Sequence, residues 1–242
     1  MIARVLFCMI AILIISGPAQ AQELSLSLGD GGSLSARTLQ LLALLTVLSL
    51  APGLAIMITC FPFMVTVLGI LRQGIGLQQS PPNMLIVSLA LFLTYFVMEP
   101  VFMVAWEQGI DPLLQEAIPI ETAITQTLEP FRQFMAARLD GDTFAAMAAL
   151  RPDATGIAPG PDAPLSVLVP SFLLSEISRA FQIGFLVFLP FLIIDLVVAA
   201  ILMSMGMMMV PPAIVSLPFK LAFFVIADGW SLIAGSLVRG YF

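Results

Sequence analysis

Residues 183–238 read IGFLVFLPFLIIDLVVAAILMSMGMMMVPPAIVSLPFKLAFFVIADGWSLIAGSLV, and this stretch decides the class of fold. Its first limb, residues 183–205, is apolar except for Asp195. A short turn over 206–212 separates it from a second limb, residues 213–238. A helix needs about 20 apolar residues to cross a bilayer, and both limbs are long enough. The stretch therefore predicts a helical hairpin at membrane depth.

A similar pair of apolar runs lies upstream. Residues 38–71 carry no charge, but Pro52-Gly53 and Pro62 interrupt them, which predicts a kinked or broken helix. A polar turn over 72–83 leads into a second run, residues 84–106. We expect residues 37–106 to form the first hairpin and residues 171–242 to form the second, which has the Met-rich tip.

The composition supports a membrane protein. The chain of 242 residues is 60% apolar and 10% charged, with a mean hydropathy of +1.08, whereas soluble domains average about 25% charged residues. The predicted fold is all-α and integral to the membrane, with two long kinked helical hairpins and about four helices at membrane depth.

The nine Lys and Arg residues are scattered singly, so no basic patch suited to nucleic acid exists.

The N-terminal residues resemble a targeting segment. Residues 1–21 hold Arg4, a short apolar run, Gly17-Pro18 and a small-x-small triplet at 19–21, which predict a cleaved signal peptide. An uncleaved signal anchor is the alternative. Residues 22–36 are rich in Ser and Gly and should form a polar leader.

Most of the acidic residues lie between the two hairpins. Residues 107–170 hold most of the fifteen Asp and Glu residues, with Pro and Gly throughout. We expect a periplasmic insertion of modest order, with an amphipathic helix around Glu129 to Leu150. The signal peptide places this insertion and both chain ends outside the cell membrane and both hairpin tips on the cytoplasmic side. Because so few Lys and Arg residues flank the spans, the inverted topology stays open.

Three charged residues interrupt the second hairpin, namely Asp195, Lys220 and Asp228. An ionisable group at membrane depth is costly unless it is paired or faces water. With a turn near Met208, Asp195 and Lys220 each lie about 19 Å from the tip at 1.5 Å per residue. We expect a structural ion pair between them; a role in moving protons or substrate is the alternative. Asp228 is about two helical turns further on, so its partner is expected in another subunit.

The turn of the second hairpin is rich in methionine. Five methionines fall within residues 203–209, directly before Pro211-Pro212. Methionine is flexible and apolar, which suits surfaces that close around varied shapes. The turn therefore predicts a gasket or gate, with simple filling of the hairpin tip as the alternative.

Residue types for catalysis or cofactor binding are scarce. The chain has no His, and Cys60 stands alone once residues 1–21 are removed, so the usual transition-metal sets and Ser-His or Cys-His pairs are absent. We expect no metal, no cofactor and no enzymatic activity. Two alternatives are a proton-coupled transporter that uses Asp195, Lys220 and Asp228 as a relay and an intramembrane enzyme that uses Ser216 with Lys220.

Several segments together resemble the FliP family of flagellar export-gate subunits, whose counterpart in virulence secretion is the SctR family. In the second hairpin these segments are FQIGF (181–185), FLIIDLV (191–197), GMMMVPP (206–212), LPFK (217–220) and DGW (228–230). Upstream they are LRQ (71–73), PPN (81–83), LALFLT (89–94) and PFRQFM (130–135). The likeness runs from the signal peptide to the C-terminus.

The resemblance implies a structural and gating subunit of the flagellar type III export channel, in the bacterial inner membrane at the flagellar basal body. It implies a homo-oligomer with FliQ- and FliR-type subunits, next to FlhA- and FlhB-type components, around a narrow conduit for unfolded substrates. The gasket would be Met205, Met207, Met208 and Met209. A virulence-type export gate is the alternative within the same family.

The sequence departs from the family pattern at two places. FliP-type sequences usually have Thr-Ser-Phe-Thr-Arg in the first hairpin, where this chain has TCFPF at residues 59–63 and thus lacks the arginine. Near Glu176 the basic residue is displaced to Arg179. Any contact between subunits that the family makes through the missing arginine is not expected here.

Overall fold

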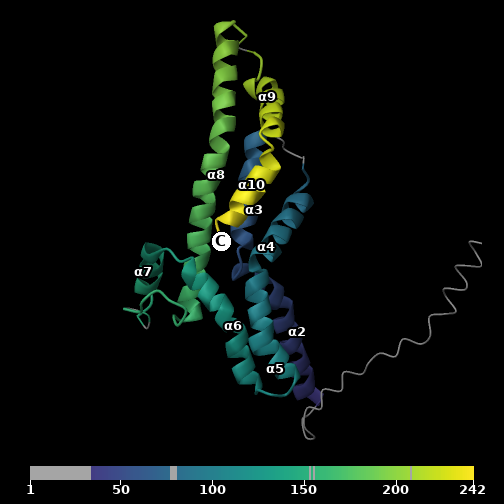
Figure 1. Cartoon of the computed structure of the whole chain (residues 1–242), viewed down its shortest axis with the longest axis vertical. Helices are drawn as coiled ribbons and strands as arrows, with labels where there is room; N and C mark the ends of the chain where they lie inside the picture. Colours follow the sequence, from purple (N-terminus) through teal and green to yellow (C-terminus); the bar gives the residue numbers. More distant parts are fainter. Residues whose placement is uncertain (1–33, 77–80, 153, 155, 208) are drawn as a thin grey trace, which may run out of the picture. The chain divides into compact units, whose positions relative to one another are not determined.

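The computed structural model describes residues 34–76, 81–152, 154, 156–207 and 209–242 (Figure 1). Every regular element in these ranges is helical. The elements are α2 (Leu34–Met57), α3 (Phe61–Ile75), α4 (Asn83–Ala105), the π-helix η1 (Trp106–Ile110), α5 (Asp111–Leu114), α6 (Ile120–Ala137), α7 (Gly141–Ala149), α8 (Leu165–Ser204), α9 (Pro212–Ile226) and α10 (Gly229–Arg239). The predicted signal peptide and residues 22–33 of the predicted leader lie outside the described residues. The chain divides into residues 1–48 and 49–242, and the packing below is that of the second unit.

Three helical stretches in the described part of the chain are long and apolar enough to cross a membrane. They are Thr38–Met57, Asn83–Leu114 and Leu165–Ser204. A fourth is added when α9 and α10, which meet at an angle of 61°, are taken as one broken span. The expectation of an all-α membrane protein is therefore confirmed.

The first apolar run breaks where α2 ends and α3 begins. Pro52 lies inside α2, and the break falls at residues 58–60. Pro62 follows in the first turn of α3. Backbone N–H groups in a first turn have no partner within the helix, so proline, which lacks this group, is tolerated there. Cys60 precedes this turn as the N-cap of α3 and is fully buried.

Helix α3 is the centre of the main core. Its buried residues recur at helical spacing along one face, and that face packs against α8 and α4. Gly184 of α8 lets the two helices approach closely, because a Cβ there would lie 2.4 Å from Ile70 Cδ1 of α3. Figure 1 shows α8 running alongside α3 and extending beyond its end.

The insertion is far better ordered than the sequence analysis expects. Helix α4 continues through η1 and α5 to Leu114, α6 and α7 follow, and α8 already begins at Leu165. Phe144 of α7, Met135 of α6 and Phe172 of α8 form a second buried core. Arg132 also donates hydrogen bonds to the carbonyls of Pro161 and Ala163, at 2.8 and 2.9 Å. The amphipathic faces of α6 and α7 thus find a partner in the N-terminal part of α8.

The single helix expected around Glu129 to Leu150 is instead two helices. The break falls at residues 138–140, where Asp140 adopts an extended conformation and caps α7. Its carboxylate accepts hydrogen bonds from the Thr143 backbone N–H at 2.8 Å and hydroxyl at 2.7 Å. Asp is among the preferred N-cap residues, so this local signal overrides the longer amphipathic pattern.

The returning limb of the second hairpin is also broken, although the sequence analysis treats it as continuous. Asp228 has φ 47° and ψ 49°, a left-handed conformation that ends α9. Gly229 follows, and a Cβ at that position would lie 2.2 Å from Phe224 Cε2. The chain therefore turns at Asp228 and packs closely directly after it.

Replacement of Asp140 by Ala is expected to lower the thermal unfolding midpoint of the detergent-solubilised chain by about 2 to 4 °C, since it removes the cap of α7. The hydrogen bonds from the Thr143 side chain and backbone lower the pKa of the Asp140 carboxyl. Its stabilising effect is therefore present above the ordinary Asp pKa of about 3.9 and is lost as the pH falls through the lowered value. Asp142→Ala is the control, because Asp142 lies in the first turn of α7 but does not cap the helix. Equal midpoints for the two variants would contradict the cap.

Candidate functional site

Asp195 of α8 and Lys220 of α9 lie side by side, as the depth argument expects. Lys220 Nζ is 2.6 Å from Asp195 Oδ2, and the two side chains are 7% and 32% exposed. The Ser216 hydroxyl donates to Asp195 Oδ1 at 2.5 Å, so both carboxylate oxygens have a partner. Lys220 Nζ also donates to the Gly74 carbonyl at 3.1 Å, a contact that joins α3 to the pair. These bonds explain how the pair is tolerated at this depth.

Asp228 does not belong to this pair. It precedes α10 in its left-handed conformation, is exposed, and accepts a hydrogen bond from the Ser231 hydroxyl at 3.1 Å. This hydrogen bond lies within the chain, and the expected partner of Asp228 in another subunit stays a prediction.

The methionine-rich turn is exposed on the described chain. Met205 is 64% exposed, Met207 43% and Met209 97%, while Met208 lies outside the described residues. Gly206 has φ +75°, which only Gly adopts readily, and this conformation turns the chain directly after α8. We call residues 196–219 the Met-tipped arm: the part of α8 beyond Asp195, the turn, and the part of α9 before Lys220.

The Met-tipped arm is apolar on its outer faces and has an apolar groove between its helices. A cavity of about 500 Å³ lies between α8 and α9. Its lining residues are Ile193, Ile194, Val197, Val198, Ile201, Leu202, Met205, Val215 and Phe219. Such a surface needs lipid or protein around it to be stable.

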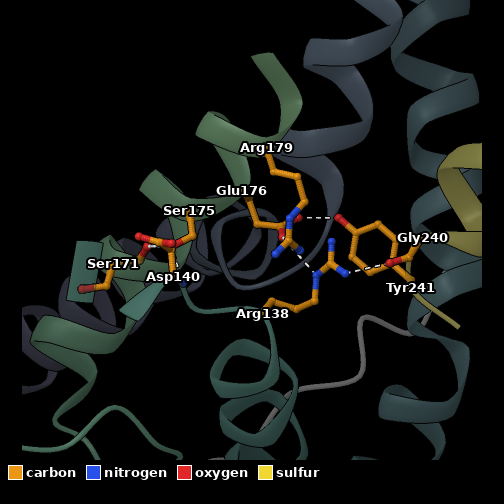
Figure 2. Close-up of polar contacts among 8 residues, drawn as sticks. All are labelled: Arg138, Asp140, Ser171, Ser175, Glu176, Arg179, Gly240 and Tyr241. Atoms are coloured by element: carbon orange, nitrogen blue, oxygen red, sulfur yellow. Dashed lines mark hydrogen bonds and ion pairs between the residues drawn. The ribbon is translucent and has the colours of Figure 1, made fainter. Parts of the chain in front are cut away.

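A second charged cluster surrounds Glu176, which is fully buried in α8 (Figure 2). We call Arg138, Glu176, Arg179, Gly240 and Tyr241 the Glu176 cluster. Arg138 Nε lies 3.2 Å from one carboxylate oxygen, Arg179 Nη1 lies 3.7 Å from the same oxygen, and the Tyr241 hydroxyl donates to the other. Arg138 also donates to the Gly240 carbonyl at 2.8 Å and lies 3.9 Å above the Tyr241 ring. The cluster thus joins the insertion, α8 and the segment after α10.

Little of this cluster could be predicted from the sequence. Arg179 is the displaced basic residue expected near Glu176, yet Arg138 makes the shorter contact and is the more buried partner. Arg138 is the C-cap of α6, and Tyr241 comes 65 residues after Glu176. The one available signal is Glu176 itself, a carboxylate in a predominantly apolar helix, which requires a partner when buried.

In the described part of the chain, no three side chains of His, Cys, Asp or Glu gather closely enough to hold a metal ion.

Replacement of Asp195 by Asn is expected to destabilise the chain by about 3 kcal/mol, because it leaves the Lys220 ammonium without its counter-charge in a buried site. Asp228→Asn is the matched control, since that side chain is exposed and Asn tolerates the left-handed conformation. Thermal unfolding in detergent measures both. A midpoint for Asp195→Asn that equals the control would contradict a stabilising ion pair.

Replacement of Tyr241 by Phe is expected to cost about 1.5 to 3 kcal/mol, the usual range for a hydrogen bond to a charged group. Tyr95→Phe is the control, because Tyr95 is exposed and is the other Tyr of the chain. Burial, together with the Glu176 carboxylate, raises the pKa of the Tyr241 phenol. The stability difference between the native chain and Tyr241→Phe should hold up to about pH 10, the ordinary Tyr pKa, and vanish as the pH rises through the raised value. A difference that vanishes below pH 9 would contradict this arrangement.

Comparison with known proteins identifies the family. The model of the FliP family matches residues 44–237. The flagellar biosynthetic protein FliP of Caulobacter vibrioides is 51% identical over 235 residues, which cover 96% of this chain and 87% of that protein. The FliP proteins of Rhizobium meliloti and Bacillus subtilis are 48% and 45% identical, and the matches cover 96% and 84% of this chain and 96% and 92% of those proteins. The chain therefore belongs to the FliP family and is a membrane subunit of the flagellar export apparatus.

Proposed function

We propose that several copies of this chain assemble with FliQ- and FliR-type membrane subunits into a narrow conduit for unfolded flagellar substrates. In this assembly the methionine-rich turns converge and close the conduit. The role is structural and gating, without enzymatic chemistry. FlhA- and FlhB-type components of the apparatus are the expected neighbours.

The exposure of the methionine-rich turn is the observation that carries the proposal. Met209 is 97% exposed, and Met205 and Met207 are also open to the surroundings. Methionine is unbranched, so several such side chains can fit together around a closed pore and rearrange when a polypeptide passes. The apolar outer face of the Met-tipped arm offers neighbouring copies a surface to cover.

We place the assembly in the bacterial inner membrane, with the acidic insertion facing the periplasm. Two features support this orientation: the resemblance of residues 1–21 to a signal peptide, and the concentration of acidic residues in the insertion. In the second unit, α5 and α6 lie toward the end opposite the methionine-rich turn (Figure 1). With the insertion in the periplasm, that turn faces the cytoplasmic side of the conduit.

Purification with and without the partner subunits tests the assembly. The chain is expressed alone or with FliQ- and FliR-type subunits and extracted in mild detergent, and the complexes are weighed by native mass spectrometry. A homo-oligomer that takes up both partners is expected. A monomer or dimer that ignores them would overturn the proposal.

Replacement of Met207, Met208 and Met209 by Ala is expected to leave complex yield unchanged and to increase ion leak through the complex severalfold. The shorter side chains can no longer fill the closed conduit. Met84→Ala is the matched control, since Met84 is 80% exposed in α4, away from the turn. Leak is measured as ion flux from vesicles that contain the purified complex. An unchanged leak in the triple variant would argue against a gasket.

A further inference from the structure

Lys220 occupies a junction of three helices. Its Nζ lies 2.6 Å from Asp195 Oδ2 of α8 and donates to the Gly74 carbonyl of α3 at 3.1 Å. The last carbonyls of a helix have no partner within that helix, and Gly74 is next to last in α3. Lys220 is also the one lysine of the whole sequence. One ammonium group thus holds α3, α8 and α9 together.

Close packing supports the same junction from the side of α3. A Cβ at Gly74 would lie 3.0 Å from Phe191 Cδ2 and 3.1 Å from Phe188 Cδ2, so only hydrogen fits there without a shift. Gly76 ends α3 in the left-handed conformation, with φ +86°. A Cβ at Gly76 would be 3.8 Å from both Leu217 Cδ1 and Lys220 Nζ, so the end of α3 lies directly against α9.

Beyond this junction, the Met-tipped arm loses the support of α3. Figure 1 shows α8 and α9 extending past the end of α3. Along the arm the buried residues are Val198, Leu202 and Ser216, while Leu196, Ile201 and Ile214 are 61, 52 and 70% exposed. Val198 and Leu202 line the groove between α8 and α9, so the described arm packs on itself. Its orientation within the chain is therefore set at its base.

A small change at the base is enlarged at the tip. From Asp195 to Met207 the arm measures about 18 Å at 1.5 Å per residue, so a tilt of about 5° moves the turn by about 1.6 Å. That shift is a sizeable fraction of a methionine side chain. Packed helices commonly change arrangement by such small rotations about a fixed contact.

The geometry points to the junction of Gly74, Asp195 and Lys220 as the pivot that sets the position of the gate. Lys220 acts as a positioning residue: it fixes the base of the Met-tipped arm relative to the first hairpin and so holds the methionine-rich turn at the closed conduit. The first hairpin thereby controls the turn without touching it. This inference rests on the proposed gating function.

A pair of glycine substitutions in α3 tests the pivot. Gly74→Ala forces Phe188 and Phe191 away by a few tenths of an ångström, whereas Gly69→Ala has open space and serves as the control in the same helix. The complex with Gly74→Ala is expected to leak ions severalfold more than the native complex, and that with Gly69→Ala to match it. Native mass spectrometry confirms that both variants assemble.

Chemical labelling reports on the junction independently of leak. Because Lys220 supplies the one ε-amine of the chain, its acetylation by an amine-reactive ester can be followed on a single peptide. Its side chain is 7% exposed, so slow labelling is expected in the native complex and in Gly69→Ala, and severalfold faster labelling in Gly74→Ala. Native leak and native labelling in an assembled Gly74→Ala complex would overturn the pivot.

A second variant covers the case in which Gly74→Ala fails to assemble. The double change Asp195→Asn with Lys220→Met removes both charges together, which avoids an unpaired buried charge, and it leaves the Gly74 carbonyl without its donor. It is expected to assemble and to leak. A double variant that assembles and leaks no more ions than the native complex would overturn the pivot.

The methionine variant separates this inference from the function on which it rests. Suppose that the Ala triple variant at 207–209 leaks more ions than the native complex, while the assembled Gly74→Ala and double variants do not. The gasket proposal is then supported and the pivot is wrong. If none of them leaks, the gasket is wrong and the pivot falls with it.

Discussion

The buried ammonium of Lys220 is the contact on which the arrangement of the second hairpin depends. A charge at membrane depth is tolerated only when protein groups replace its water, and here the Asp195 carboxylate and the Gly74 carbonyl do so. This requirement forces α3, α8 and α9 to meet at one place. The Met-tipped arm then extends from that place with its apolar faces and its methionine-rich turn exposed. The groups that replace water around Lys220 thereby also fix the base of the Met-tipped arm, which carries the proposed gate.

The Glu176 cluster meets the same requirement in another part of the chain. The carboxylate is fully buried, and Arg138 and Tyr241 reach it from segments far apart in the sequence. Arg138, from the end of α6, provides positive charge beside Glu176 within the same chain. The insertion is thereby tied to α8 and to the segment after α10.

Much of the fold could be predicted from the sequence, because long apolar runs have few alternatives to membrane helices. Matching depth on two limbs of a hairpin was enough to pair Asp195 with Lys220, and family motifs were enough to name the apparatus. The order of the insertion was underestimated, since its core forms between helices distant in the chain, such as Phe144 with Phe172. Breaks at Asp140 and Asp228 were missed because cap bonds and a left-handed residue decide them locally. Tyr241 beside Glu176 could not be foreseen, since no periodicity relates residues 65 apart.

The proposed gate requires the methionine-rich turns of several copies to meet at the closed conduit. Disulfide cross-linking tests it most directly: Met209→Cys, in a chain whose Cys8 is replaced by Ser and whose Cys60 stays buried, is oxidised within the assembled complex with its partner subunits. The account predicts covalent dimers of the chain that form quickly and disappear on reduction. Met84→Cys, exposed away from the turn, should give none. An assembled complex in which Met209→Cys fails to cross-link would contradict convergence of the turns and, with it, the gate.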